Sequence, residues 1–246
     1  MQKTVFLFPG QGSQTVGMGQ ALAASSPQAR ARLTTIDEAL GESLSSLMTD
    51  GPLDKLTLTR NAQPALFASS VAVLAALEAA SGKPLSALAD FVAGHSLGEY
   101  SALAAAGTLE IQDAAHLLRL RGDSMQKAVP VGAGAMAALL GADLELADAI
   151  VAESSDAGLV QIANDNAPGQ IVVSGSLAGV EKAMAVAKEK GVRRALKLPV
   201  SAPFHCDLMA PVAQEMAAAL ASTSMKDAAM PVICNISASG ETSASA

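Results

Sequence analysis

The sequence predicts an α/β protein with a parallel sheet, into which a small subdomain with a different order of elements is inserted. Three observations support this prediction. In the first half of the chain, short apolar strands alternate with helices, as in parallel sheets covered on both faces. After Pro130 the order changes to βαββαβ, the split βαβ pattern of a ferredoxin-like unit. Half of the residues are hydrophobic and 16% are charged, which is the composition of an ordered globular protein.

The first half begins with an apolar strand, Val5–Phe8, which Pro9 ends. The following loop, residues 9–14, turns sharply at its glycines. A second strand is expected at 91–93. Helices are expected at residues 15–24, 27–40, 64–80, 97–106 and 111–126.

The second half contains the βαββαβ pattern, which starts in the small apolar segment 133–140. We place the inserted subdomain at residues 130–199, with Pro130 and Pro199 near its hinges, and the larger core at residues 1–129 and 200–246. No structure is assigned to the tail from Ser237, which is rich in Ser, Ala and Gly. The remaining elements are expected as a helix at 144–153, a strand at 160–163, a turn at 164–169, a strand at 170–174, a helix at 178–190 and a strand at 194–198.

Composition excludes some classes of partner. The net charge of −7 repels phosphate backbones, and one Tyr, five Phe and no Trp are too few for a base-stacking surface. We expect no nucleic-acid partner and no membrane span, because Glu78 and several small polar residues interrupt the apolar stretches. Two cysteines make neither a disulfide framework nor a metal site, so a cytoplasmic protein is expected.

Ser96 is the strongest candidate for a catalytic residue. It lies in Gly94-His95-Ser96-Leu97-Gly98, between a predicted strand and a predicted helix, which is the pattern of a nucleophile elbow. The helix end is partly positive, and its amides can stabilise an oxyanion. The alternative is a glycine-rich turn whose serine only caps the helix.

A catalytic serine needs a general base, and the chain has three histidines. His95 adjoins Ser96 in a turn where neighbours point to different sides, and His116 lies in the middle of a predicted helix. His205 follows a Pro-rich loop that can direct a side chain into a cleft, so it is the best candidate. Its neighbour Cys206 is a weaker candidate nucleophile than Ser96 and is expected to be an inert thiol.

Four motifs carry a resemblance to a known family. They are Pro9-Gly10-Gln11-Gly12-Ser13-Gln14, Gly94-His95-Ser96-Leu97-Gly98-Glu99-Tyr100, Arg119-Leu120-Arg121-Gly122 and Ser201-Ala202-Pro203-Phe204-His205-Cys206. In this order they resemble the malonyl-CoA:acyl carrier protein transacylases, which act in fatty-acid synthesis and are related to acyltransferase domains of polyketide synthases. The resemblance covers essentially the whole chain. It implies an α/β-hydrolase-like core with an inserted ferredoxin-like subdomain.

The resemblance also implies roles for individual residues. Ser96 is the residue that becomes acylated, and His205 is its base. The backbone amides of Gln11 and Leu97 form the oxyanion hole, and Arg121 binds the malonyl carboxylate; the alternative for Arg121 is a surface arginine on the helix. Phe204, before His205, would narrow the substrate pocket, as in the malonyl-type relatives.

The chain departs from the family pattern at its C-terminal end. Family members continue for some tens of residues past the position of Ala246, with a final strand and helix. That part normally supplies the group that orients the catalytic histidine, so we expect this group beyond Ala246. We therefore expect the C-terminal part of the core to be missing.

The implied reaction moves a malonyl group from malonyl-CoA through malonyl-Ser96 to the phosphopantetheine thiol of acyl carrier protein. Coenzyme A and the carrier are substrates, so no metal and no bound cofactor are expected, and we expect a monomer. The alternatives are a serine thioesterase that uses water as acceptor, a carrier-binding module without catalysis, and malonyl transfer in polyketide or malonate metabolism.

Docking of an acidic carrier protein to this acidic chain would need a local basic surface. Six of the sixteen basic residues lie in one segment of the small subdomain. A solvated, charged helix end is the competing interpretation. The six residues are Lys182, Lys188, Lys190, Arg193, Arg194 and Lys197.

Overall fold

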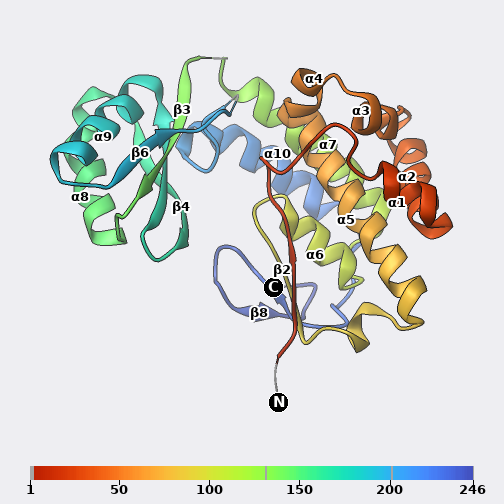
Figure 1. The fold of residues 1–246 in the computed structure, drawn as a ribbon. Coiled ribbons are helices and arrows are strands. Elements are labelled where there is room, and N and C mark those ends of the chain that lie inside the picture. The colour runs from red at the N-terminus through yellow and green to blue at the C-terminus, as the bar shows by residue number, and fades with distance from the viewer. Residues whose placement is uncertain (1–2, 131, 201, 246) are drawn as a thin grey trace. The chain divides into compact units, whose positions relative to one another are not determined.

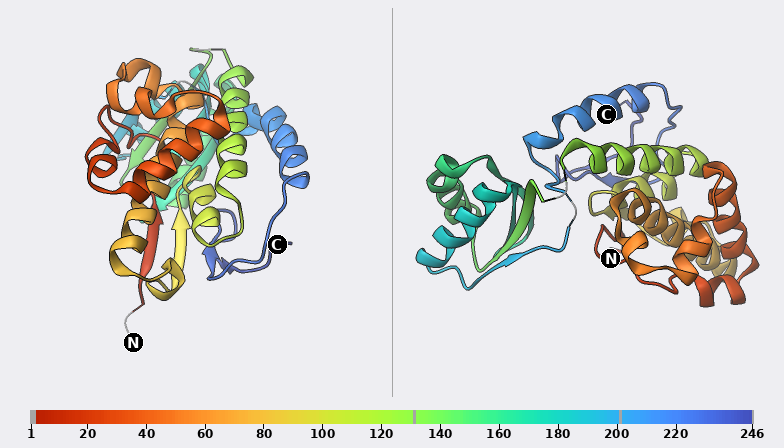
Figure 2. Two further views of the ribbon diagram at one scale, coloured as in Figure 1. Left: turned by 90° about the vertical axis from the view of Figure 1, so that its right-hand side faces the viewer. Right: turned by 90° about the horizontal axis from the view of Figure 1, so that it is seen from above.

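The computed structural model describes residues 3–130, 132–200 and 202–245. Contacts within the chain divide it into two compact units. The first consists of residues 1–123 and 218–246, and the second of residues 124–217. Figures 1 and 2 show the elements of each unit.

The first unit is built on the predicted parallel sheet. Its strands are β1 (Val5–Phe8), β2 (Phe91–Gly94), β7 (Val232–Ile233) and β8 (Gly240–Glu241), and their order is β1-β2-β7-β8. The first three are parallel, and β8 is antiparallel to β7. The register pairs Phe8 with Gly94, so the carboxyl ends of β1 and β2 lie side by side. The loops that follow these two strands therefore start at the same edge of the sheet.

Helix α6 packs on this sheet and contacts β1, β2 and β7 directly. The buried side chains between them include Phe8, Val92, Ala102 and Val232. The helical elements of this part of the chain are α1 (Gln20–Ser25), α2 (Pro27–Leu40), α3 (Leu44–Asp50), α4 (Leu53–Thr57), α5 (Thr59–Ser81), a short 3-10 turn (Leu85–Ala87), α6 (Gly98–Ala105) and α7 (Ile111–Ala128).

The structure of this unit differs from the sequence predictions at several places. The helix expected at 15–24 starts only at Gln20, because Gly17 and Gly19 adopt φ of +90° and +80°, outside the helical region. The short helices α3 and α4 were not predicted, since they bury too few side chains to show a helical period. The tail after Ser237 is not without structure: Gly240–Glu241 pair with β7, because any backbone can complete a sheet edge.

Helix α5 begins at Thr59, five residues before the predicted start at Pro64. Pro64 has no N–H, so it leaves the carbonyl of Arg60 without its helical donor. The guanidinium of Arg119 in α7 donates to that carbonyl instead. The two helices are close here, since a Cβ on Gly122 would lie 2.6 Å from Cα of Arg60. A residue of another helix therefore compensates for the proline.

By length and composition, α5 could cross a membrane, and it is the one such helix among the described residues. In the structure it packs against α2 and α6. Two of its buried residues, Thr59 and Gln63, are polar and hydrogen-bond to side chains of other elements. Its role as the central helix of the first unit accounts for its apolar composition.

The second unit has the predicted βαββαβ order. Its strands are β3 (Gly134–Leu140), β4 (Val160–Ala167), β5 (Gln170–Ser176) and β6 (Arg194–Lys197), and its helices are α8 (Leu144–Ser154) and α9 (Leu177–Glu189). The sheet order is β4-β5-β3-β6 with antiparallel neighbours, as in a ferredoxin-like fold. Both helices lie on one face of this sheet (Figure 2). Between them lies an apolar core that includes Leu139, Ile150, Val173 and Val186.

The second unit extends past the predicted insertion, residues 130–199, at both ends. It also contains the end of α7, the loop with His205 and residues 210–217 of α10 (Ala210–Ala221). A hydrogen bond from the Ser124 hydroxyl to Glu215 joins the two added segments within this unit. The α/β class and the ferredoxin-like order that the sequence predicts are confirmed.

Candidate active site

Ser96 lies in the turn between β2 and α6, and its φ of +52° is in the left-handed region. Such a backbone costs a non-glycine residue about 1–3 kcal/mol. Neither neighbouring glycine can carry a side chain. A Cβ on Gly94 would lie 1.9 Å from the carbonyl carbon of Gly98, and one on Gly98 would lie 2.5 Å from O of Phe8. The turn therefore has the shape of a nucleophile elbow.

Two backbone amides near this turn are available to a ligand. The N–H groups of Gln11 and Leu97 donate to no acceptor in the described part of the chain. Leu97 precedes the first residue of α6, so its amide lies at the positive end of a helix. Gln11 lies in the loop after β1. That loop is close to the turn, since a Cβ on Gly10 would lie 2.6 Å from Nδ1 of His95. Two such amides can together stabilise an oxyanion.

Arg121 in α7 reaches Ser96. Its Nη2 donates to Ser96 Oγ at 3.1 Å, and its Nη1 donates to Gln63 Oε1 at 2.6 Å. Gln63 in turn donates to Thr59 Oγ1 at 3.2 Å, and Thr59 donates to Gln11 Oε1 at 2.6 Å. The side chains of Gln11, Thr59, Gln63, Arg121 and Ser96 thus form a continuous series of hydrogen bonds, in which Arg121 donates in both directions. This series links the loop after β1 to the serine.

Arg119 and Arg121 have different environments, although both lie on α7. Arg119 pairs with Glu42 and also donates to Asn61 Oδ1 at 2.9 Å, so its role in the structure is to hold these segments. No ion pair in the described part of the first unit includes Arg121. Arg121 is therefore not a paired surface arginine. Its guanidinium can accept a carboxylate in the fork geometry that arginine favours.

The electrostatic environment of Arg121 is set by burial and by two neighbours. Burial lowers the pKa of its guanidinium from the usual value, while Tyr100 and Glu99 act in the opposite direction. The guanidinium carbon lies 6.0 Å from the centre of the Tyr100 ring. Burial also raises the pKa of Glu99, although a hydrogen bond from the Asn235 amide and the charge of Arg121 lower it. Arg121 stays protonated at neutral pH, because arginine does not lose its proton in proteins.

His205 belongs to the second unit, where it is exposed at a φ of +57°. It and Ser96 are two of only three non-glycine residues with positive φ in the described chain. The segment after His205 is held by Gln161, which accepts from Asp207 N at 2.8 Å and donates to Asp207 Oδ2 at 2.9 Å. A strained backbone held by its surroundings is typical of functional sites.

The other residues of this motif have structural contacts. Phe204 is buried at 6% exposure, and Pro203 covers Gly134, where a Cβ would lie 2.3 Å from Cγ of Pro203. The thiol of Cys206 donates to O of Pro203 at 3.2 Å. Ser201, the first residue of the motif, lies outside the described residues.

The other two histidines, His95 and His116, are both exposed. His116 lies on α7 and His95 lies in the turn before Ser96. In the described part of the chain, no three His, Cys, Asp or Glu side chains gather as metal ligands. The six basic residues of the predicted docking surface all belong to the second unit, on or after α9 and on β6.

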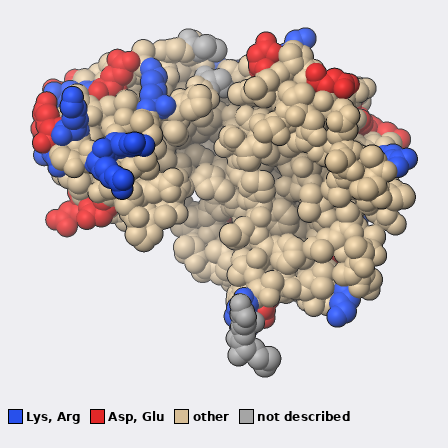
Figure 3. Space-filling view, viewed as in Figure 1, with Lys and Arg blue, Asp and Glu red and all other residues tan. Residues whose placement is uncertain are grey.

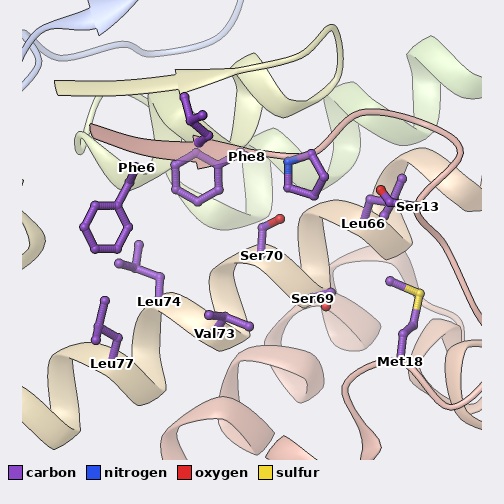
Figure 4. A pocket seen from close by; sticks show the side chains of 12 residues that line it. Phe6, Phe8, Ser13, Met18, Leu66, Ser69, Ser70, Val73, Leu74 and Leu77 are labelled. Carbon is purple, nitrogen blue, oxygen red and sulfur yellow. The ribbon is translucent and has the colours of Figure 1, made fainter. Parts of the chain in front are cut away.

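A separate cavity of about 280 Å³ lies between β1 and α5 (Figure 4). Phe6 and Phe8 of the strand face Leu74 and Leu77 of the helix across it. The polar groups in its lining are serine hydroxyls, and no charged side chain lines it. It is therefore unsuited to bind a carboxylate, and neither Ser96 nor Arg121 contributes to it.

Gln63, Asn235 and Gln161 are not among the site residues that the sequence predicts. Gln63 and Gln161 carry no local signal, because their partners are distant along the chain. Asn235, in contrast, did carry a local signal in the sequence. It lies two residues after Ile233, the end of the strand β7, at the sheet edge where polar residues of parallel strands gather.

Comparisons with known proteins place the chain in a family. Residues 5–245 match the family described as the acyl transferase domain. The malonyl CoA-acyl carrier protein transacylase of Bacillus subtilis is 50% identical over 239 residues, which are 97% of this chain and 74% of that protein.

Solved structures are also similar. The acyl-carrier-protein-S-malonyltransferase of Bartonella henselae aligns with a TM-score of 0.95 at 49% identity, over 99% of this chain and 77% of that one. A malonyl-transacylase in complex with its type II PKS acyl-carrier protein aligns with a TM-score of 0.94 at 39% identity, over 99% of this chain and 78% of the other.

The bridge between Arg121 and Thr59 predicts the effect of Gln63→Leu. Leucine has a similar size but no polar atom, so Arg121 Nη1 and the Thr59 hydroxyl lose a buried partner. The free energy of unfolding should fall by about 1–3 kcal/mol, measured by chemical denaturation. Gln112→Leu, at an exposed position on α7, is the matched control and should change it by no more than about 0.5 kcal/mol. Equal stability of the Gln63→Leu protein and the wild type would contradict the assigned bridge.

Proposed function

Because the chain belongs to the acyl transferase family, we propose that it transfers a malonyl group from malonyl-CoA to the phosphopantetheine thiol of an acyl carrier protein, in fatty-acid synthesis. One observation supports this substrate above others. The guanidinium of Arg121 lies 3.1 Å from Ser96 Oγ and has no carboxylate partner in the described part of its unit. A malonyl ester on Ser96 would place its free carboxylate only two bonds beyond the ester carbonyl, within reach of this cation.

In the first half-reaction, Ser96 Oγ attacks the thioester carbonyl of malonyl-CoA. His205 takes the serine proton, and the Gln11 and Leu97 amides stabilise the oxyanion. The carbon–sulfur bond then breaks, and the proton passes from His205 to the leaving thiolate of coenzyme A. Arg121 holds the malonyl carboxylate throughout.

In the second half-reaction, the phosphopantetheine thiol of the carrier gives its proton to His205 and attacks the carbonyl of malonyl-Ser96. The ester bond to Ser96 breaks, and His205 returns the proton to Ser96 Oγ. The chemistry is symmetric, since a thioester is broken in one half and formed in the other. The same groups therefore serve both halves.

We also propose that the protein acts in the cytoplasm as a monomer and without a bound cofactor. Both acyl carriers are substrates in the proposed reaction. The two cysteines, Cys206 and Cys234, are free thiols, which fits a reducing compartment.

The carrier would dock on the basic residues of the second unit. Figure 3 shows basic side chains on this unit, near β6 and α9. Two of the six are paired within the unit, Lys190 with Glu153 at 2.7 Å and Lys197 with Glu181 at 3.6 Å. The other four form no ion pair among the described residues, so they are the better candidates to meet acidic groups of a carrier. These four are Lys182, Lys188, Arg193 and Arg194.

Intact-mass measurement after mixing with malonyl-CoA tests the proposed reaction. The wild type should keep one malonyl adduct until a holo-carrier is added, because the acceptor is a thiol. Ser96→Ala should form none, and His205→Ala should form it about 10²–10⁴-fold more slowly, as expected for loss of a general base. Cys206→Ala is the control and should form the adduct normally. Rapid release of free malonate without the carrier would indicate a thioesterase instead.

Arg121→Ala tests malonyl selection. Loss of the guanidinium removes charge-assisted hydrogen bonds to the carboxylate, so the preference for malonyl-CoA over acetyl-CoA should fall by about two orders of magnitude in kcat/KM. The kcat/KM for acetyl-CoA should stay the same or rise, because the variant no longer places an unpaired guanidinium beside the apolar acetyl group. The preference of the Arg121→Lys variant for malonyl-CoA should lie between those of the wild type and Arg121→Ala. Lysine keeps the positive charge but lacks the planar pair of donors that arginine offers to a carboxylate. Equal losses of kcat/KM for both substrates would show that Arg121 does not recognise the malonyl carboxylate.

Charge reversal tests the docking surface. The Lys188→Glu/Arg194→Glu variant should raise KM for the carrier several-fold at low salt and leave acylation by malonyl-CoA unchanged. Lys83→Glu, an exposed change on the first unit, is the matched control. The difference from wild type should shrink as salt is added. Equal damage to both half-reactions would be evidence against docking at this surface.

A further inference from the structure

Asn235 bridges the turn that carries Ser96. Its Oδ1 accepts a hydrogen bond from Ser96 N at 2.8 Å, and its Nδ2 donates to O of Gly94 at 2.6 Å. The two segments are 139 residues apart along the chain. One amide side chain thus satisfies a donor and an acceptor on both sides of His95.

The strand register explains why this residue reaches the turn. Strands β2 and β7 are parallel, with Val92 beside Val232 and Ala93 beside Ile233. Two positions further along, the same register places Asn235 beside His95, where β2 has already ended. The side chain therefore continues the hydrogen bonding of the sheet where the backbone of β2 turns away.

The two backbone groups that bond to Asn235, the Ser96 amide and the Gly94 carbonyl, determine the orientation of Ser96. The hydrogen bond to Ser96 N fixes the peptide plane between His95 and Ser96. The angle φ of Ser96 is the rotation about its N–Cα bond relative to this plane. With the Gly94 carbonyl also held, the turn is fixed at both ends. The φ of +52° at Ser96 is a strained value that persists only where the surroundings determine it.

Asn235 is itself held in place. Its backbone N–H donates to Glu99 Oε2 at 3.0 Å, in the first turn of α6. Just before it, Cys234 N donates to O of Ser239 at 3.1 Å, and Ala238 N donates back to O of Cys234 at 2.9 Å. The bridging residue is therefore fixed to the helix that follows Ser96 and to the turn that follows β7.

We propose that Asn235 is a positioning residue for the proposed reaction: its amide holds the Ser96 turn so that Oγ is directed at the thioester. This inference rests on the proposed function. It concerns the presentation of the serine and not the choice of acyl group. Asparagine suits the position because the bridge needs one acceptor and one donor on the same short side chain. Aspartate has the same shape but cannot donate to Gly94 when ionised.

The test compares Asn235→Asp and Asn235→Ala with the wild type and with Ser237→Ala, a control in the same loop. The first measurement is the rate at which a fluorophosphonate probe labels Ser96, which needs no malonyl group. We expect labelling to slow by about tenfold or more in both Asn235 variants and to be unchanged in Ser237→Ala. Circular dichroism should show only a small shift in Tm, because Asn235 is exposed and water can replace its bonds.

Steady-state kinetics give the second measurement. For a positioning residue, kcat should fall in the Asn235→Asp variant while KM for malonyl-CoA stays near the wild-type value. The inference is overturned if folded Asn235→Asp labels at the wild-type rate, if only KM changes, or if both variants lose activity solely because they unfold. Failure of the proposed function would look different: the wild type would label normally with the probe but form no malonyl adduct.

Discussion

The backbone of Ser96 is held in the left-handed region, and much of the first unit is arranged around this constraint. The turn requires glycine on both sides, because the backbones of Gly94, Gly98 and Phe8 approach too closely for a side chain. The close approach follows from the parallel pairing of β1 with β2, which brings two loops to one sheet edge. A hydrogen bond from the Ser96 amide to Asn235 adds a contact from β7. Three strands thus contribute to the position of one side chain.

A second set of contacts ties Ser96 to Arg121, the residue proposed to bind the malonyl carboxylate. The hydrogen bonds that run from Gln11 through Thr59 and Gln63 to Arg121 cross three separate segments of the chain. Thr59 and Gln63 are buried, so breaking one link would leave a polar atom unpaired away from water. The loop after β1 and the guanidinium of Arg121 are therefore fixed by the same hydrogen bonds. In the proposed reaction, these two elements hold the two ends of the malonyl group.

The second unit supplies His205 on a scaffold of its own. Its ferredoxin-like sheet is held by an apolar core that is independent of the first unit. Gln161 on β4 fixes the segment after His205 through Asp207. The positive φ of His205 parallels that of Ser96, so each unit presents its candidate residue from a strained backbone. Side chains from distant segments support both regions: Asn235 bonds to Ser96 itself, and Gln161 bonds to Asp207, two residues after His205.

The sequence by itself determined the α/β class, the βαββαβ order and the motif around Ser96, because each depends on local patterns of apolar residues and glycines. Tertiary structure decided the rest. Pro64 lies inside α5 because Arg119 satisfies the carbonyl that the proline leaves free. Gln63 and Asn235 have partners 58 and 139 residues away. A hydrogen bond between distant segments leaves no period or spacing in the sequence, so only the folded chain identifies the residues that form it.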